Sequence, residues 1–242
     1  MPHILHLLSI YTLISFFASN LQASELQNAL GTIFCDGAVR GTASHIESPS
    51  GYQSNHSVVV TAAHVIYNQQ TDQPFSACFY RPQNKRLSAI GFKAVSTHRY
   101  STKNIDKIAQ AEGDIVFIQL KQKAYQPTLN LSENFLSNSK QLTLLHLDPN
   151  QPIDFTYSHC QQINHSYLKS YKLVLHNCPA QKGSSGSPII ERDSGRIFAI
   201  HGGRFNIKIN SDNKQSKNWV GQARRIDAAT LETLKNITKN KP

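Results

Sequence analysis

The sequence predicts an all-β fold, an antiparallel sandwich or barrel, on two observations. Short apolar segments alternate with turn residues along most of the chain, and long segments with helical periodicity are nearly absent. With 242 residues, of which 39% are hydrophobic, the chain is long enough to enclose one or two hydrophobic cores. The clearest strand candidates are residues 58–60, 77–80, 115–120, 142–145, 171–175, 189–190 and 197–200.

Residues 1–23 predict a secretory signal peptide. They contain no Lys, Arg, Asp or Glu, and residues 4–18 form an apolar run that is short for a membrane span. Ala23 supplies a small residue before a cleavage site at Ser24, although only histidines stand where basic residues are usual. We therefore expect a secreted or periplasmic protein, with an uncleaved membrane anchor as the alternative.

Four cysteines predict two disulfides. Cys35, Cys78, Cys160 and Cys178 are an even number and lack the C-x-x-C spacing of zinc and redox motifs, so no metal site is expected. Of the three possible pairings, we favour Cys35–Cys78 and Cys160–Cys178, because each closes a loop within one half of the chain. Four buried free thiols are the alternative.

A polar stretch at residues 122–138, which contains Pro127, predicts the boundary between two halves. We expect residues 24–125 and residues 126–242 to fold as separate units. The second unit should end in a helix, the one exception to the strand pattern, with Asp227 as its cap. The apolar residues that recur on one face of this helix are Leu231, Leu234 and Ile237.

The formal net charge is +10 at pH 7, and the basic residues are spread over the chain. A nucleic-acid module gathers Lys and Arg in one run or interleaves them with aromatic residues, and this sequence does neither. We expect a monomer with a basic surface, without a cofactor, and without nucleic acid or a membrane as partner once the signal peptide is removed.

A histidine follows the strand candidate 58–60 closely. His64 ends the run Thr61-Ala62-Ala63-His64 and stands where the backbone leaves the sheet. An imidazole whose pKa is near neutrality can take a proton from a hydroxyl and return it to a leaving amine, as a hydrolase general base does. The chain has eleven histidines, and a surface or hydrogen-bonded core position is the alternative.

An acidic residue precedes the strand candidate 115–120. Asp114 is placed for burial, and a buried carboxylate that accepts the other N–H of an imidazole fixes its tautomer and stabilises the imidazolium. A surface carboxylate at the start of a strand is the alternative. Asp106 is a rival, but no apolar strand follows it.

Glycines flank two serines in the run Gly183-Ser184-Ser185-Gly186-Ser187-Pro188. They permit a tight turn in which the N–H groups of Gly183 and Ser185 point at one oxygen and form an oxyanion hole beside the Ser185 hydroxyl. A flexible Gly/Ser loop is the alternative. Together the three motifs predict Ser185 as a nucleophile, His64 as its base and Asp114 as the partner of the base.

In the order His, Asp, Ser, these motifs resemble the T-A-A-H, D-I-A-L-L and G-D-S-G-G-P of the chymotrypsin/trypsin superfamily, from about Gly31 to Val220. The serine motif is most similar to the G-N-S-G-S-P of bacterial glutamyl endopeptidases. The resemblance implies two six-stranded antiparallel barrels of the chymotrypsin type with the triad between them. It also implies a secreted serine endopeptidase that cleaves polypeptides through an acyl-enzyme, and a strand led by Gly41 before the histidine loop.

The resemblance places the substrate pocket at Ile200-His201-Gly202-Gly203, which is similar to the I-H-W-G-G of glutamyl endopeptidases, whose histidine contacts an acidic side chain. We expect His201, Gly202, Gly203 and Lys182 to bind substrate and, with Arg204 nearby, to favour carboxylates. A structural role for His201 is the alternative.

Three departures from the family pattern bear on specificity and activation. Ala180 replaces a pocket threonine of the glutamyl endopeptidases, and Pro179 argues against a preference for Lys or Arg. Ser184 replaces the aspartate that activates trypsin-like zymogens, so we expect activity without that switch. Two other functions stay open: a catalytically silent binding protein on this scaffold, and a basic protein that binds anionic surfaces.

Overall fold

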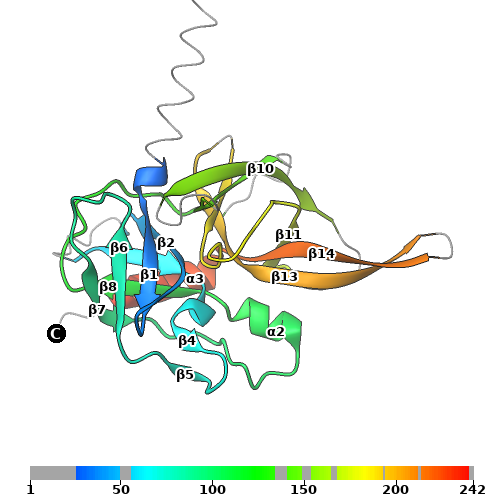
Figure 1. Cartoon of the computed structure of the whole chain (residues 1–242), viewed down its shortest axis with the longest axis horizontal. Helices are drawn as coiled ribbons and strands as arrows, with labels where there is room; N and C mark the ends of the chain where they lie inside the picture. The colour runs from blue at the N-terminus through cyan, green and yellow to red at the C-terminus, as the bar shows by residue number, and fades with distance from the viewer. Residues whose placement is uncertain are drawn as a thin grey trace, which may run out of the picture.

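The computed structural model describes residues 26–49, 56–133, 141–148, 154–164, 168–192, 194–211 and 214–239, with the backbone alone described for residues 207–218. The predicted signal peptide lies outside the described residues. Figure 1 shows two rounded β structures side by side, with a long hairpin that projects from one of them.

The first barrel consists of six antiparallel strands from the N-terminal half. Two of them, β3 and β8, are buried along their whole length, as expected for continuous apolar runs that are covered on both faces. In order around the barrel the strands are β1 (Leu30–Cys35), β2 (Ala38–Ile46), β3 (Val58–Thr61), β8 (Val116–Leu120), β7 (Ile90–Val95) and β6 (Cys78–Pro82), which pairs back to β1.

The second barrel also closes with six antiparallel strands. They are β10 (Phe155–Ile163), β11 (Leu173–His176), β14 (Lys214–Arg225), β13 (Ile197–Ser211), β12 (Pro188–Glu191) and β9 (Gln141–Leu147), which pairs back to β10. The pairing of β13 with β14 continues to Ser211 and Lys214, well beyond the barrel, and forms the projecting hairpin of Figure 1. The predicted fold class, two barrels of the chymotrypsin type, is confirmed.

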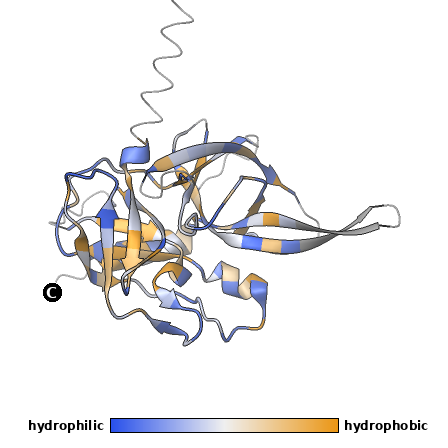
Figure 2. Cartoon of the chain, viewed as in Figure 1, coloured by the Kyte–Doolittle hydropathy of each residue, from blue (hydrophilic) through white to orange (hydrophobic). Residues whose placement is uncertain are grey.

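Buried aliphatic and aromatic side chains fill both barrels, and the largest include Phe117 and Phe198. Figure 2 shows hydrophobic residues gathered on the strands of the first barrel. Burial of one such side chain stabilises the folded chain by about 1.5–3 kcal/mol. In the first barrel, β3, β6 and β8 coincide with the predicted candidates 58–60, 77–80 and 115–120, whereas β1 and β7 were not among the candidates.

The predicted C-terminal helix is α3 (Ala228–Lys239). Asp227 caps it, since Asp227 Oδ1 accepts the N–H of Thr230 at 2.9 Å, and Leu234 and Ile237 are buried. Although α3 follows the second barrel in sequence, it packs against β8 of the first. It therefore covers the outer face of β8 and joins the two halves of the molecule.

Short elements connect the strands of the first barrel. They are the 3₁₀ turn η1 (Ala63–Val65), the two-stranded pair β4 (Tyr67–Asn68) and β5 (Gln73–Pro74), and the helix α2 (Lys107–Glu112). Among the described residues no helix has the length and apolar character needed to cross a membrane.

Both predicted disulfides are present. Cys35 and Cys78 face each other across the paired strands β1 and β6, with their Cα atoms 4.1 Å apart. Cys160 on β10 is joined to Cys178, just after β11, with a Cα separation of 4.8 Å. Each bond lies within one half of the chain, so the favoured pairing is confirmed.

Candidate active site

His64 and Asp114 meet where the first barrel faces the second. The chain leaves β3 and turns through η1, which places the His64 ring against the carboxylate. Asp114 Oδ1 accepts the His64 backbone N–H at 2.9 Å, and Asp114 Oδ2 lies 2.8 Å from His64 Nδ1. Because the carboxylate fixes both the backbone and the ring, the Nδ1 proton is retained and Nε2 is left as the basic nitrogen.

The position of Asp114 follows from the short helix before β8. Helix α2 ends at Gly113, where a Cβ would lie 2.5 Å from the Arg99 carbonyl carbon, so only glycine fits there. The next residue, Asp114, is buried, with 3% of its surface exposed. The rival Asp106 caps the start of α2, where its carboxylate accepts the Ile108 N–H at 2.9 Å, and it serves the helix.

The charge of Asp114 changes the basicity of His64. Burial lowers the pKa of His64, but the negative charge of Asp114 and its hydrogen bond raise it, and the net effect is a raised pKa. The His64–Asp114 pair therefore has the electrostatics of a general base whose pKa is raised by a buried carboxylate.

The two neighbouring serines of the Gly/Ser loop have different environments. Ser184 is fully buried, and its Oγ accepts the Gln181 N–H at 3.0 Å. Ser185 is partly exposed. Gly183 and Gly186 have φ angles of +93° and +84°, which L side chains rarely adopt, so both glycines are needed for this turn. Ser184 therefore braces the turn, and Ser185 is the serine that it presents.

Strand β2 of the first barrel holds this loop through hydrogen bonds to the carbonyl groups of the loop. Thr42 N–H donates to Ser185 O at 2.8 Å, and Thr42 Oγ1 donates to Gly183 O at 3.0 Å. A Cβ at Gly41 would lie 2.5 Å from Ser185 O, and one at Gly186 would collide with Thr42 O. The close approach of the two barrels thus depends on these glycines.

Two N–H groups of the loop are left open by this arrangement, while those of Ser184, Gly186 and Ser187 donate to carbonyl oxygens. Within the described part of the chain, neither the Gly183 N–H nor the Ser185 N–H donates to a protein acceptor. Both N–H groups belong to a loop whose carbonyl oxygens are already engaged.

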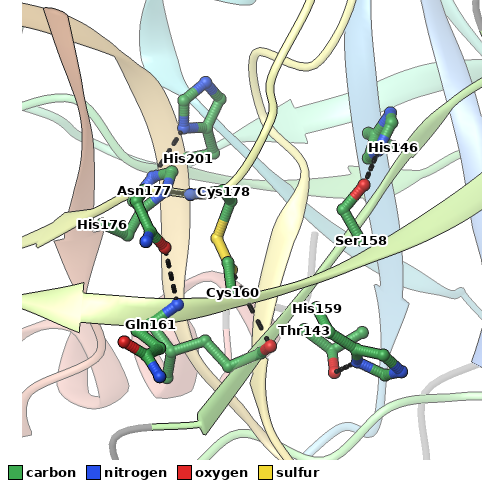
Figure 3. Close-up of a disulfide and its surroundings, with 11 residues drawn as sticks. Thr143, His146, Ser158, His159, Cys160, Gln161, His176, Asn177, Cys178 and His201 are labelled. Atoms are coloured by element: carbon green, nitrogen blue, oxygen red, sulfur yellow. Dashed lines mark hydrogen bonds between the residues drawn. A yellow bond between two sulfur atoms is a disulfide. The ribbon is translucent and has the colours of Figure 1, made fainter.

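His201 lies next to a second buried histidine. The Cys178 N–H donates to His176 Nδ1 at 3.2 Å, so the neutral His176 ring carries its proton on Nε2. That proton faces His201 Nδ1 at 3.1 Å, which leaves His201 with its own proton on Nε2. Figure 3 shows the two rings side by side next to the Cys160–Cys178 bond.

Burial keeps both of these histidines neutral. Burial lowers the pKa of His176 to about 4, with the charge of Arg204 acting in the same direction. Burial and the neighbouring positive groups also lower the pKa of His201 far below its usual value. His201 can therefore offer a neutral N–H donor, whereas Lys182 and Arg204 are exposed cations, and the charge of Arg204 acts on both buried histidines.

A family model described as a trypsin-like peptidase domain matches residues 49–200. The chain belongs to the trypsin-like peptidase family. It is a serine endopeptidase with the chymotrypsin-like fold, as its two barrels indicate. A search of curated proteins finds no sequence match.

Solved structures of other peptidases share this fold at low sequence identity. A Glu endopeptidase in complex with MPD has a TM-score of 0.62 and 11% identity, over 88% of this chain and 92% of the other. A thermostable serine protease, AL20, from an extremophilic microorganism has a TM-score of 0.64 and 13% identity, over 89% and 99%. Protease Anisep from Arthrobacter nicotinovorans has the same TM-score and identity, over 89% and 98%. At these identities the likeness is one of fold.

Sequence reasoning did not single out two residues that lie beside the candidate site residues His201 and Gly202. His176 is the last residue of the apolar strand β11, much as His64 stands soon after β3, and this pattern could have drawn attention to it. Gln222 lies against Gly202, and only the pairing of β13 with β14 brings it there. Gly202 itself, predicted to bind substrate, stands with its Cα next to the Asp114 carboxylate.

Proposed function

We propose that this peptidase cleaves polypeptides through an acyl-enzyme on Ser185, with His64 as general base and Asp114 as the partner that orients it. The observation that carries the proposal is the double contact of Asp114 with His64, in a barrel whose Thr42 holds the loop of the partly exposed Ser185. This arrangement supplies the three groups that acyl transfer needs, namely a base, the carboxylate that orients the base, and a hydroxyl as nucleophile.

The reaction proceeds in two steps. His64 Nε2 takes the Ser185 hydroxyl proton as Ser185 Oγ bonds to the scissile carbonyl carbon, and the protonated imidazole then gives this proton to the leaving amine as the C–N bond breaks. In the second step water attacks the ester, His64 takes its proton, and Ser185 Oγ leaves with that proton. The N–H groups of Gly183 and Ser185 donate to the oxyanion in both steps.

Substrate preference is proposed to favour Glu or Asp on the acyl side of the scissile bond. His201 supplies a neutral Nε2–H donor, which serves a carboxylate or an amide oxygen alike. Lys182 and Arg204 supply the positive charge that separates Glu from Gln. Gly203 completes the wall of the pocket through its backbone.

We also propose that the peptidase acts outside the cytoplasm. Two disulfides favour an oxidising compartment, and residues 1–23 have the composition of a signal peptide. N-terminal sequencing of the protein recovered from the medium or the periplasm should begin at Ser24. A mature chain that begins at Met1 would refute export by cleavage.

A peptide-library digest of the purified mature chain tests the catalytic assignment. Ser185→Ala should lower turnover by several orders of magnitude without loss of folding, because the hydroxyl contributes chemistry and little packing. Ser184→Ala is the matched control, and it should alter stability more than chemistry, since Ser184 Oγ braces the turn. The assignment is wrong if Ser185→Ala retains turnover and Ser184→Ala loses it.

A further inference from the structure

The loop that carries Ser185 begins with a tight turn from Gln181 to Ser184. The Ser184 N–H donates to the Gln181 carbonyl at 3.0 Å, which closes a four-residue turn with Lys182 and Gly183 at its centre. The φ of Gly183 is +93°, whereas the φ of Lys182 is not positive. A positive φ at the third residue alone identifies a type II turn, since a type I turn has a negative φ there.

The type of this turn decides where the Gly183 N–H points. Types I and II share the closing hydrogen bond and differ mainly by a rotation of their central peptide, which here joins Lys182 to Gly183. In the type II form of this chain, the Gly183 N–H donates to no acceptor among the described residues. Rotation to type I would turn this N–H away and bring the Lys182 carbonyl to the same side. An oxyanion hole that uses the Gly183 N–H therefore depends on contacts that favour type II.

Gln181 anchors the first residue of the turn to β9. Its Nε2 donates to the carbonyl of Leu147, the last residue of β9, at 2.6 Å. Its backbone N–H donates across the turn to Ser184 Oγ at 3.0 Å. The Leu147 side chain lies next to the turn as well, because a Cβ at Gly183 would lie 2.8 Å from Leu147 Cδ1. The turn is therefore attached to one residue of the barrel through both hydrogen bonding and packing.

The carbonyl that Gln181 binds is itself held in place. His146 Nδ1 lies 2.9 Å from the Leu147 carbonyl oxygen, and because a carbonyl only accepts, this nitrogen carries a proton. The Leu147 oxygen thus accepts one hydrogen bond from His146 and one from Gln181. His146 Nε2 then accepts from the Ser158 hydroxyl on β10 at 2.9 Å, a bond drawn in Figure 3. Two strands of the second barrel therefore fix the acceptor of Gln181.

The first barrel holds the far side of the same turn. Thr42 Oγ1 donates to the Gly183 carbonyl at 3.0 Å. The peptide between Lys182 and Gly183 therefore lies between two anchors, Gln181 on the side of β9 and the Gly183 carbonyl on the side of β2. Ser184 replaces the aspartate that activates trypsin-like zymogens, so this turn needs a hold of another kind.

We propose that Gln181 is a positioning residue whose bond to the Leu147 carbonyl keeps the turn in the type II form and directs the Gly183 N–H at the substrate oxyanion. This inference rests on the proposed function, because it assumes the oxyanion hole of Gly183 and Ser185. Gln181 supplies the hold on the loop that the missing aspartate cannot supply. The hole is then formed before substrate binds, and substrate binding energy is not used to form it.

The test compares steady-state kinetics of peptide cleavage by the mature chain and by variants of two glutamines. Gln181→Met keeps the length of the side chain and removes the donor, and Gln181→Glu replaces the donor with an acceptor. Gln126→Met is the matched control, because Gln126 is also partly buried and its Nε2 donates to the Tyr80 hydroxyl on β6 at 2.6 Å. Thermal melting reports the stability of each variant.

We expect Gln181→Met and Gln181→Glu to lower kcat about tenfold with KM within about twofold of wild type, because the oxyanion exists only in the transition state. Complete loss of one oxyanion donor, on the order of 10²- to 10³-fold, sets the upper limit. Gln126→Met should leave kcat within about twofold. A peptide aldehyde, whose adduct with Ser185 places an oxygen in the hole, should bind the Gln181 variants about tenfold more weakly. The matching peptide alcohol, which forms no adduct, should bind all variants equally.

A kcat in the Gln181 variants equal to that of Gln126→Met, or a rise in KM alone, would overturn the proposal. NMR of the Gly183 amide in a Ser185→Ala background, with and without Gln181→Met, follows the turn without turnover. We expect a shifted or second Gly183 signal when Gln181 is replaced, and an unchanged signal would also overturn the proposal. This readout decides on Gln181 even if the wild-type chain cleaves no peptide, a result that would contradict the proposed function instead.

Discussion

At the scale of single residues, one member of each candidate pair is assigned to the chemistry and the other stabilises the local structure. Of the two neighbouring serines in the loop, Ser184 is buried and bonded to Gln181, and Ser185 is partly exposed. Of the two candidate acids, Asp106 caps a helix and Asp114 holds His64. Local sequence suggested Ser185 and Asp114 in each case because each stands at the boundary of an apolar strand or a glycine turn.

The first residue-scale prediction separates the two acids. Asp114→Asn should lower kcat on the order of 10⁴-fold, because an amide in this position favours the wrong imidazole tautomer and cannot stabilise the imidazolium. Asp106→Asn should leave kcat within about twofold, since Asp106 only accepts an N–H at the start of α2. Steady-state kinetics at pH 8 measure kcat for both variants. Equal losses of kcat would contradict the assignment of Asp114 as the partner of His64.

A second residue-scale prediction concerns the pocket. His201→Ala should lower kcat/KM for substrates with Glu or Gln before the scissile bond, compared with kcat/KM for substrates with Ala at that position. The reason is that a neutral N–H can donate to either a carboxylate or an amide oxygen. Lys182→Ala and Arg204→Ala should lower it for Glu alone, and that difference should shrink as salt screens the two charges. Equal cleavage after Glu and Gln by the wild type, or a preference for Lys, would contradict the pocket assignment.

At the scale of elements, apolar runs and caps were predictable and strand pairing was not. Residues 58–60 and 115–120 became β3 and β8 because continuous apolar runs need burial on both faces. The long β13–β14 hairpin and the bulge at Gly202 depend on pairing between strands. For the same reason no local pattern revealed that Gln222 lies against Gly202 or that Cys178 sets the tautomer of His176.

The element-scale prediction is a loss of stability on removal of the α3 cap. Asp227 accepts the Thr230 N–H and an Arg224 hydrogen bond at 2.7 Å, and Arg224 is 5% exposed. Asp227→Ala should lower the free energy of unfolding by about 1–3 kcal/mol, from the lost cap and the partly unpaired guanidinium. Glu232→Ala, an exposed change on the same helix, should cost under about 0.5 kcal/mol in urea unfolding. Equal losses of unfolding free energy in the two variants would refute the stabilising role of the Asp227 cap.

At the scale of the whole molecule, the two barrels are joined where the site lies. Thr42 of the first barrel holds the Ser185 loop of the second, and α3 of the C-terminal half packs on β8 of the first. In the second barrel, burial lowers the pKa values of His176 and His201, and the His201 carbonyl accepts the Gly186 N–H of the same loop. Conditions that lower the stability of the folded chain, such as mild acid, should therefore also disturb the catalytic geometry.

The whole-molecule prediction is a loss of stability in mild acid. His176 has a pKa of about 4 when folded and about 6.5 when unfolded, so the unfolded chain binds more protons between these values. Its contribution is fully present above pH 6.5 and is lost as the pH falls toward 4, by roughly 3 kcal/mol. His64, whose folded pKa is raised, acts with the opposite sign.

Urea unfolding from pH 8 to pH 4 measures this dependence. His176→Asn should flatten the fall in stability, whatever its effect on stability at pH 8. His159→Asn, a change at an exposed histidine on β10, should leave the slope as it is in the wild type. A wild-type slope in His176→Asn would mean that another group carries the acid response.

The central claim, that Ser185 is the nucleophile activated by His64, is tested most directly by mapping a serine-directed phosphonylating reagent on the mature chain. We predict one covalent adduct per chain, located by peptide mass spectrometry on Ser185 and absent from Ser185→Ala. Its rate of formation should rise with pH through the titration of His64 and should collapse in Asp114→Asn. An adduct on Ser184, or peptide cleavage by a chain that forms no adduct, would contradict the account.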